Sequence, residues 1–202
     1  NTDIVLVKAD GSGEMTNLTE SGYSDNNAKW VLDGKAMIWS SDRAGYRSHG
    51  SWGAEDDIYI MFFDGEAYDK FRLTKEEQAL LDDEKEDKDK DKDDKDKDSK
   101  KNKDKDKDSD KKKDEKDDKP VEPLKFDLAN RKDRIMRLTV NSSFLGDAVL
   151  TPKGDKLYYC AAFEDGYDLW EHNFKENTTK LLIKGVGGGT MFPDKKGENI
   201  FL

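Results

Sequence analysis

Short runs of β-branched and aromatic residues recur along the chain, and each is followed by a tight-turn signal. Residues 3–7 are followed by Asp10-Gly11, and residues 57–63 repeat this pattern before Asp64-Gly65. Such runs favour strands, and Asp-Gly favours a chain reversal. We therefore predict antiparallel hairpins. Their first and returning segments are 3–7 with 18–19, 57–63 with 72–74, 124–128 with 137–139, and 167–170 with 180–182.

A second module lies between these hairpins, in residues 29–45, 150–159 and 192–201. In each copy a short strand turns at a glycine flanked by acidic and basic residues and then enters an apolar strand. Two successive hairpins make a four-stranded antiparallel unit of about 40 to 50 residues, the length of a propeller blade. A sheet with two apolar faces has to stack on neighbours. We predict an all-β chain of incomplete β-propeller blades. A β-sandwich is the alternative, disfavoured because the same turn recurs at the same place in each unit.

Helical periodicity is nearly absent from the folded segments. Residues 75–83 could form a helical turn or two before a tract of 36 residues, 84–119, which holds 16 Lys and 17 Asp or Glu. Such a composition cannot offset the entropy of ordering the chain. We predict a disordered linker over 75–123, joining the last blades of a first propeller (1–74) to the first blades of a second (124–202).

Alternating carboxylates within the tract resemble a calcium loop only superficially. Asp89, Asp91 and Asp93 have the spacing of EF-hand ligands, but Asp94 stands where that loop needs Gly and Lys100 where it needs Glu. The spacing therefore favours a solvated linker over a metal site.

The charge of the chain outside the tract limits its partners. With the tract removed, 20 basic and 29 acidic residues remain, a net charge of about −9. This surplus repels phosphate backbones and anionic lipid. No run approaches the roughly 20 apolar residues that span a bilayer. We expect no nucleic acid partner and no membrane insertion, whereas cationic peptides remain compatible.

Catalytic and ligand-binding signatures are weak throughout. His49 and His172 each favour a surface or turn position, and Arg43 favours pairing with a turn carboxylate or carbonyl. Cys160 has apolar neighbours, which favour a buried thiol and leave the compartment, periplasmic or cytoplasmic, open.

The sequence also lacks the neighbouring residues that serine catalysis and phosphate binding require. The Ser40-Ser41 and Ser142-Ser143 pairs have no nearby base in the sequence. The Gly-rich segment 185–190 lacks the ending and the helix of a phosphate loop and is typical of a turn between blades. We predict no catalytic, cofactor-binding or metal-ligating residue and no cofactor.

The frame Trp30-x-x-Asp33-Gly34-Lys35-x-x-Ile38-x-x-Ser41-x-Arg43-x-Gly45, with residues 57–59 and 72–74 after it, resembles a known blade repeat. The periplasmic Tol-system propeller and the tricorn-type serine proteases share that repeat. Residues 126–138 are similar to the segment with which tricorn-type enzymes pass from their first propeller into their second.

The resemblance implies a bacterial-type, tail-specific serine peptidase whose propellers gate unfolded peptides toward a protease domain, expected beyond Leu202. The Ser, His and Glu of that domain have no counterpart in these residues, so the fragment itself is expected to be inactive. A homo-oligomer of the parent enzyme is compatible with this assignment. The alternatives are a Tol-like protein-binding module and the propeller of a prolyl-oligopeptidase-type hydrolase, which a Gly-x-Ser-x-Gly motif would follow.

Overall fold

The computed structural model describes residues 1–49, 53–83, 124, 126–194 and 196–202. Two compact units result, one made of residues 1–72 and 124–202 and the other of residues 73–123. All the strands named below belong to the first unit. This unit therefore contains residues from both sides of the charged tract.

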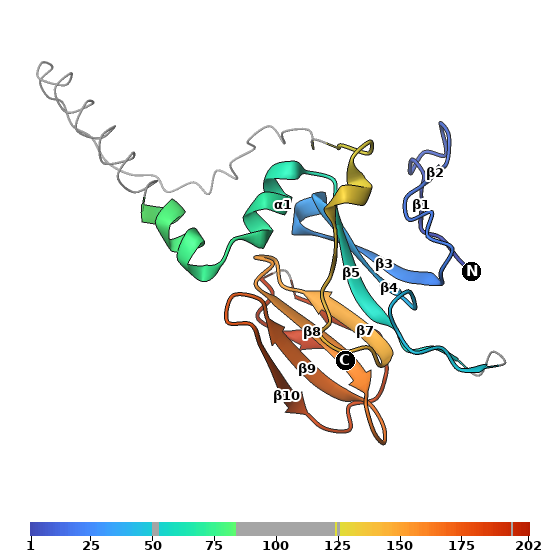
Figure 1. The fold of residues 1–202 in the computed structure, drawn as a ribbon, viewed down its shortest axis with the longest axis vertical. Coiled ribbons are helices and arrows are strands. Elements are labelled where there is room, and N and C mark those ends of the chain that lie inside the picture. The colour runs from blue at the N-terminus through green and yellow to red at the C-terminus, as the bar shows by residue number, and fades with distance from the viewer. Residues whose placement is uncertain (50–52, 84–123, 125, 195) are drawn as a thin grey trace, which may run out of the picture. The chain divides into compact units, whose positions relative to one another are not determined.

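Two four-stranded antiparallel sheets dominate the first unit, each with its strands in sequence order (Figure 1). The first sheet contains β3 (Asp25–Val31), β4 (Ala36–Ser41), β5 (Asp57–Phe62) and β6 (Ile135–Arg137). The second contains β7 (Phe144–Leu150), β8 (Lys156–Ala162), β9 (Asp168–Asn173) and β10 (Thr178–Ile183). Two further hairpins pair β1 (Val5–Leu6) with β2 (Thr16–Asn17), and β11 (Phe192–Pro193) with β12 (Ile200–Phe201). The predicted all-β, four-stranded antiparallel architecture is confirmed.

Alternating side chains along β4 and β5 give the first sheet two apolar faces. One face, which includes Ile38 and Ile60, packs with Leu157 and Tyr159 of the second sheet. The opposite face, which includes Trp39, packs around Leu18 and the β1–β2 hairpin. Since each such side chain gains about 1.5–3 kcal/mol from full burial, neither face is stable in water alone. Both are covered by a neighbouring layer.

The second sheet repeats this arrangement on its outer face. Cys160 and Leu169 pack there against Met191 and Ile200, which belong to the segment containing the β11–β12 hairpin. The order of layers is therefore hairpin, sheet, sheet, hairpin. This is the stacking that the sequence pattern predicts for repeated units.

The fourth strand of the first sheet comes from beyond the tract. In β6, Arg137 pairs with Tyr59 and Ile135 pairs with Met61 of β5. The segment that follows the tract runs beside β5 in Figure 1. The tract thus lies between the third and fourth strands of one sheet, not at a seam between two sheets. Assignment of 1–74 and 124–202 to two successive propellers stays a prediction.

Two predicted hairpins are wrong because β5 pairs with β6, from beyond the tract, instead of with residues 72–74. Instead of a strand at 72–74 that returns against 57–63, the chain forms helix α1 (Gly65–Arg72). Asp64 caps it by accepting a 2.9 Å hydrogen bond from the Ala67 amide, and Tyr68 and Phe71 pack into the core between the sheets. The described residues 124 and 126–128 form no strand with 137–139, because the segment that begins at Arg137 pairs with β5. The hairpins 3–7 with 18–19 and 167–170 with 180–182 are confirmed as β1–β2 and β9–β10.

In the second unit, residues 75–83 are helical. Thr74 and Glu77 form a capping box, in which the Glu77 amide donates to the Thr74 hydroxyl at 3.2 Å and the Thr74 amide donates to the Glu77 carboxylate at 2.8 Å. The predicted disorder of 84–119 and the comparison with an EF-hand both concern residues outside the described ones.

Candidate functional site

A buried carboxylate stands at the start of β5, at one end of the first sheet. Asp57 accepts hydrogen bonds from the Thr139 hydroxyl at 2.6 Å, the Ser142 hydroxyl at 2.8 Å and Arg137 Nε at 2.9 Å. The Thr139 hydroxyl in turn accepts the amide of Ile58 at 3.2 Å. This network closes the sheet at the end where the candidate site lies.

The same closure recurs in the layer before it. Thr19 donates to Asp3 at 3.3 Å and accepts the amide of Ile4 at 3.1 Å. In the second sheet, Asp168 accepts the amide of Gly185 at 2.9 Å. Asp57, Asp3 and Asp168 are therefore each held by hydrogen bonds to another segment of the chain, but only Asp57 and Asp3 have a threonine partner.

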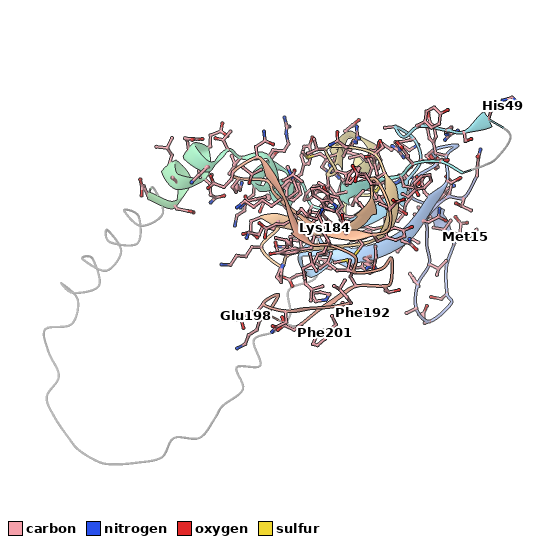
Figure 2. The ribbon with its side chains drawn as sticks, turned by 90° about the horizontal axis from the view of Figure 1, so that it is seen from below. Met15, His49, Lys184, Phe192, Glu198 and Phe201 are labelled. Atoms are coloured by element: carbon pink, nitrogen blue, oxygen red, sulfur yellow. The ribbon has the colours of Figure 1, made fainter. Side chains whose placement is uncertain are left out.

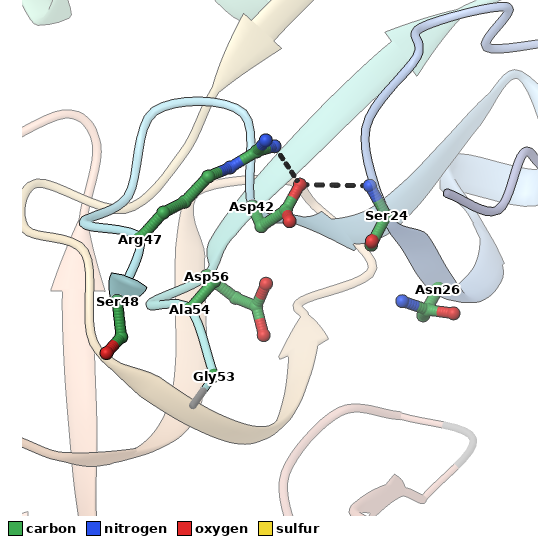
Figure 3. A pocket seen from close by; sticks show the side chains of 8 residues that line it. All are labelled: Ser24, Asn26, Asp42, Arg47, Ser48, Gly53, Ala54 and Asp56. Atoms are coloured by element: carbon green, nitrogen blue, oxygen red, sulfur yellow. Dashed lines mark hydrogen bonds and ion pairs between the residues drawn. The ribbon is translucent and has the colours of Figure 1, made fainter. Parts of the chain in front are cut away.

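Beside this end of the first sheet, the loop between β4 and β5 borders an open polar cavity of about 460 Å³ (Figure 3). The two described arms of this loop, residues 42–49 and 53–56, run back alongside each other, with Arg47 bridged to Ala54. Gly45 permits this fold, because a Cβ there would lie 1.8 Å from the carbonyl oxygen of Glu55. Eight residues line the cavity: Ser24, Asn26, Asp42, Arg47, Ser48, Gly53, Ala54 and Asp56.

One of the two carboxylates in the cavity is paired. Asp42 Oδ1 accepts a hydrogen bond from Arg47 Nη2 at 2.8 Å and another from the Ser24 amide at 2.9 Å (Figure 3). The ion pair joins the tip of the loop to its base, and the amide bond joins the loop to the residue before β3. The positive charge of Arg47 is therefore neutralised by Asp42.

The second carboxylate, Asp56, is positioned through its backbone. Its amide donates to the Ser143 carbonyl at 2.8 Å, and its own carbonyl accepts the Ser143 amide at 3.2 Å. Partial burial raises the pKa of the Asp56 carboxyl to about 6, and the charges of Asp42 and Asp57 add to the shift. Within the part of the chain that the structure describes, no hydrogen bond or ion pair reaches the Asp56 carboxylate.

Arg43 belongs to the same loop, but its side chain packs against aromatic residues of the first sheet. Its guanidinium is 4.8 Å from the ring centroid of Tyr59 and 5.8 Å from that of Trp39, and its Nη2 is 3.9 Å from Asp25. This packing agrees with a structural role for Arg43, but the predicted pairing with a turn carboxylate or carbonyl is not what forms. The carboxylate beside it is that of Asp25, which opens β3, and among the described residues Arg43 Nε and Nη2 have no hydrogen-bond partner.

Both histidines lie away from a reactive setting. His49 is exposed at the tip of the β4–β5 loop, as predicted (Figure 2). The surface or turn position predicted for His172 is wrong, because that side chain is buried within β9. Its Nδ1 lies 2.9 Å from the Thr179 hydroxyl, its ring packs edge-on against Phe174, and burial lowers its pKa.

The remaining predicted residues take structural positions. Cys160 is buried, as expected, and burial raises the pKa of its thiol. The Ser40 hydroxyl donates to the Asn26 carbonyl at 3.2 Å, while Ser41 and Ser143 are buried. The Gly-rich segment 185–190 connects the second sheet to the β11–β12 hairpin, in agreement with a turn between layers.

Sequence reasoning missed the cavity residues Asp42, Arg47 and Asp56. They meet only because the described arms 42–49 and 53–56 pair through Arg47 and Ala54, and the sequence between them has no Asn-Gly or Asp-Gly signal. The adjacent acids Asp56 and Asp57 were the available signal for this cavity. Neighbouring residues of a strand point to opposite sides, so if one carboxylate is buried the other lies on the opposite side.

The chemistry available in the cavity is polar binding. Among the described residues, no group of three His, Cys, Asp or Glu side chains could hold a metal ion, and none of the described helices could span a membrane. Comparison with known proteins adds no identity, because the chain matches no family profile, no curated protein and no solved structure.

Proposed function

We propose that this chain is a non-catalytic part of a β-propeller that gates or channels unfolded peptides toward a protease domain in a tricorn-like serine peptidase. The observation that carries the proposal is the stacking of consecutive four-stranded meanders on both faces. A blade has this topology, and closure of such layers into a ring is part of the proposal.

The repeated Asp and Thr closure supports the same assignment. A sandwich has no need to place the same Asp and Thr pair in two successive units, whereas a propeller repeats each blade around an axis. The pairs Asp57 with Thr139 and Asp3 with Thr19 occupy equivalent places in neighbouring layers.

Contacts between successive layers also suit a ring. Lys29 on β3 forms an ion pair with Asp147 on β7, and its Nζ donates to the carbonyls of Ala148 at 3.1 Å and Met191 at 3.3 Å. The first strand of each blade is the innermost one in a propeller, so these groups would line the channel. Charged and polar groups there would meet peptide passing through it.

Peptidase assays on two versions of the protein test the proposal. Residues 1–202 alone should not hydrolyse an unfolded protein substrate, whereas a longer natural chain with the downstream region should. Removal of 1–202 from the longer chain should then relax its discrimination between short peptides and long unfolded chains.

Three results would overturn the proposal. Hydrolysis that co-purifies with residues 1–202 would assign the activity to this region. A downstream region without a peptidase domain would favour the Tol-like binding module, and a Gly-x-Ser-x-Gly elbow there would favour a prolyl-oligopeptidase-type hydrolase.

A further inference from the structure

The cavity in the β4–β5 loop carries one uncompensated negative charge. Arg47 neutralises Asp42 at 2.8 Å, which leaves the Asp56 carboxylate without a cation among the described residues. A half-buried carboxylate without a counter-ion is costly, and a bound cation would remove that cost. The site therefore favours a positively charged guest.

The donors and acceptors around the cavity narrow the kind of cation. A metal ion would need several carboxylate or imidazole ligands, and the described residues form no such group. Asn26, Ser24 and Ser48 instead line the rest of the cavity with neutral polar side chains, and Asn26 Oδ1 already accepts a hydrogen bond from the Thr2 hydroxyl at 3.2 Å. An ammonium group has three donors and no acceptor, so it matches an unpaired carboxylate in a polar cavity.

The size of the cavity indicates what carries the ammonium group. About 460 Å³ lies within the range of volumes found for small-ligand sites, so the cavity has room for one amino-acid side chain or one chain terminus. We propose that this cavity binds a primary ammonium group of a peptide, either the α-ammonium or a lysine side chain, with Asp56 as its counter-ion. The assignment to a peptide rests on the proposed function, whereas the ammonium site itself does not.

Protonation should switch the site off. The charges that act on Asp56 are those of Asp42 from the same loop and of Asp57, whose carboxylate is held by its own network, and Arg47 is held by Asp42. The segment 138–143 packs against Asp56 through the backbone of Ser143 and places Arg137 on Asp57. Because the pKa of Asp56 is raised to about 6, ammonium binding should weaken as the pH falls from 7.5 to 5.

Calorimetry and amide chemical shifts of the intact 202-residue chain at pH 7.5 test the proposal. The probes are n-butylammonium, n-butanol as its uncharged match, a tripeptide amide with a free N-terminus, its N-acetylated form, and an N-acetylated peptide with one lysine. We expect n-butylammonium to bind and n-butanol not to. Binding of the free-terminus peptide indicates the α-ammonium, and binding of the acetylated lysine peptide indicates the side chain.

Two variants should change affinity in opposite directions. Asp56→Asn should weaken n-butylammonium binding by about tenfold or more, because it removes the charge and keeps the shape. Arg47→Gln frees the Asp42 carboxylate and should tighten binding by roughly threefold or more. Asp165→Asn, an exposed acid in the β8–β9 turn, is the matched control and should change nothing. Thermal melts followed by circular dichroism verify that each variant is folded.

The outcomes separate the ammonium site from the peptide function. Equal binding of n-butylammonium to the native chain and Asp56→Asn, or no binding at all, overturns the site. Weaker binding in Arg47→Gln overturns the charge assignment even if Asp56→Asn fails to fold. Binding of n-butylammonium without any peptide supports the site and rejects its peptide assignment.

Discussion

The Thr139 hydroxyl donates a 2.6 Å hydrogen bond to the Asp57 carboxylate, although the two residues are 82 positions apart in the sequence. Both are buried, and the contact joins the start of β5 to the residues after β6. It fixes one end of a sheet whose third and fourth strands are separated by the charged tract.

Removal of this contact should destabilise the fold. Asp57→Ala leaves three donors without their acceptor and should lower the free energy of unfolding by about 2–4 kcal/mol. Thr139→Val keeps the shape, loses one hydroxyl and should cost about 1–2 kcal/mol. Urea unfolding followed by tryptophan fluorescence measures both effects.

Thr178→Val is the control, because Thr178 is exposed on β10. It should change the free energy of unfolding by no more than about 0.5 kcal/mol. If Asp57→Ala were as stable as this control, the network would not be the closure of the sheet.

Local patterns predicted most of the fold, and distant pairing explains where they failed. The modules at 29–45 and 150–159 were found because strand, turn and strand are adjacent in sequence. The chain contains two Arg-Leu-Thr segments, 72–74 and 137–139, and local pattern cannot choose between them as the partner of β5. The residues before the first segment form α1, whose partly buried Tyr68 and Phe71 pack against the core, and the second segment pairs with β5.

The cavity was hidden from the sequence for a similar reason. Asp42, Arg47 and Asp56 are unremarkable as loop residues, and their proximity depends on a hairpin without a strong turn signal. The burial that raises the pKa of Asp56 comes from packing, which the order of residues does not specify.

Shortening of the tract should leave the first unit intact. Replacement of residues 75–122 by a 12-residue Gly/Ser linker should stabilise it by about 1 kcal/mol, because each halving of loop length contributes only about 0.6 kcal/mol. Urea unfolding and far-ultraviolet circular dichroism check this result.

A deletion that extends into α1 provides the contrast. Replacement of residues 65–122 by the same linker also removes Tyr68 and Phe71, which pack against the core, and should destabilise the unit by several times as much as the shorter deletion stabilises it. Loss of cooperative unfolding in the shorter deletion would show that the tract is needed for the fold.

Asp56 should give stability a measurable pH dependence. Its pKa is about 6 in the folded state and about 4 in an unfolded chain, so the folded state binds more protons between these values. Its contribution to stability is therefore fully present below about pH 4 and is lost as the pH rises through 6. We expect Asp56→Asn to be more stable than the native chain at pH 7 and to lack this contribution.

His172 acts in the same pH range with the opposite sign. Its pKa is lowered by burial, so its contribution to stability is present at neutral pH and is lost as the pH falls. The difference between the native chain and Asp56→Asn, measured by urea unfolding from pH 4 to 7.5, isolates Asp56. A difference that does not vary with pH would contradict the raised pKa.

Cys160 should react only when the chain unfolds. The thiol is buried beside Met191, and burial raises its pKa, which disfavours the reactive thiolate. An aromatic disulfide reagent should label little thiol in native buffer at pH 8 and one thiol per chain in concentrated guanidinium chloride. Rapid labelling of the native chain would place Cys160 outside the core.

Insertion of the tract within a sheet also affects how the protein is made. After β5 leaves the ribosome, 72 residues must be added before β6 begins, which takes roughly 4 to 15 seconds at ordinary elongation rates. During that delay the outer edge of β5 has no strand beside it, and open strand edges pair readily with other chains. A nascent chain of this protein therefore passes through an interval, set by translation speed, in which the edge of β5 is open. During it, neighbouring chains on a polysome can pair with this edge, and a chaperone can prevent that pairing.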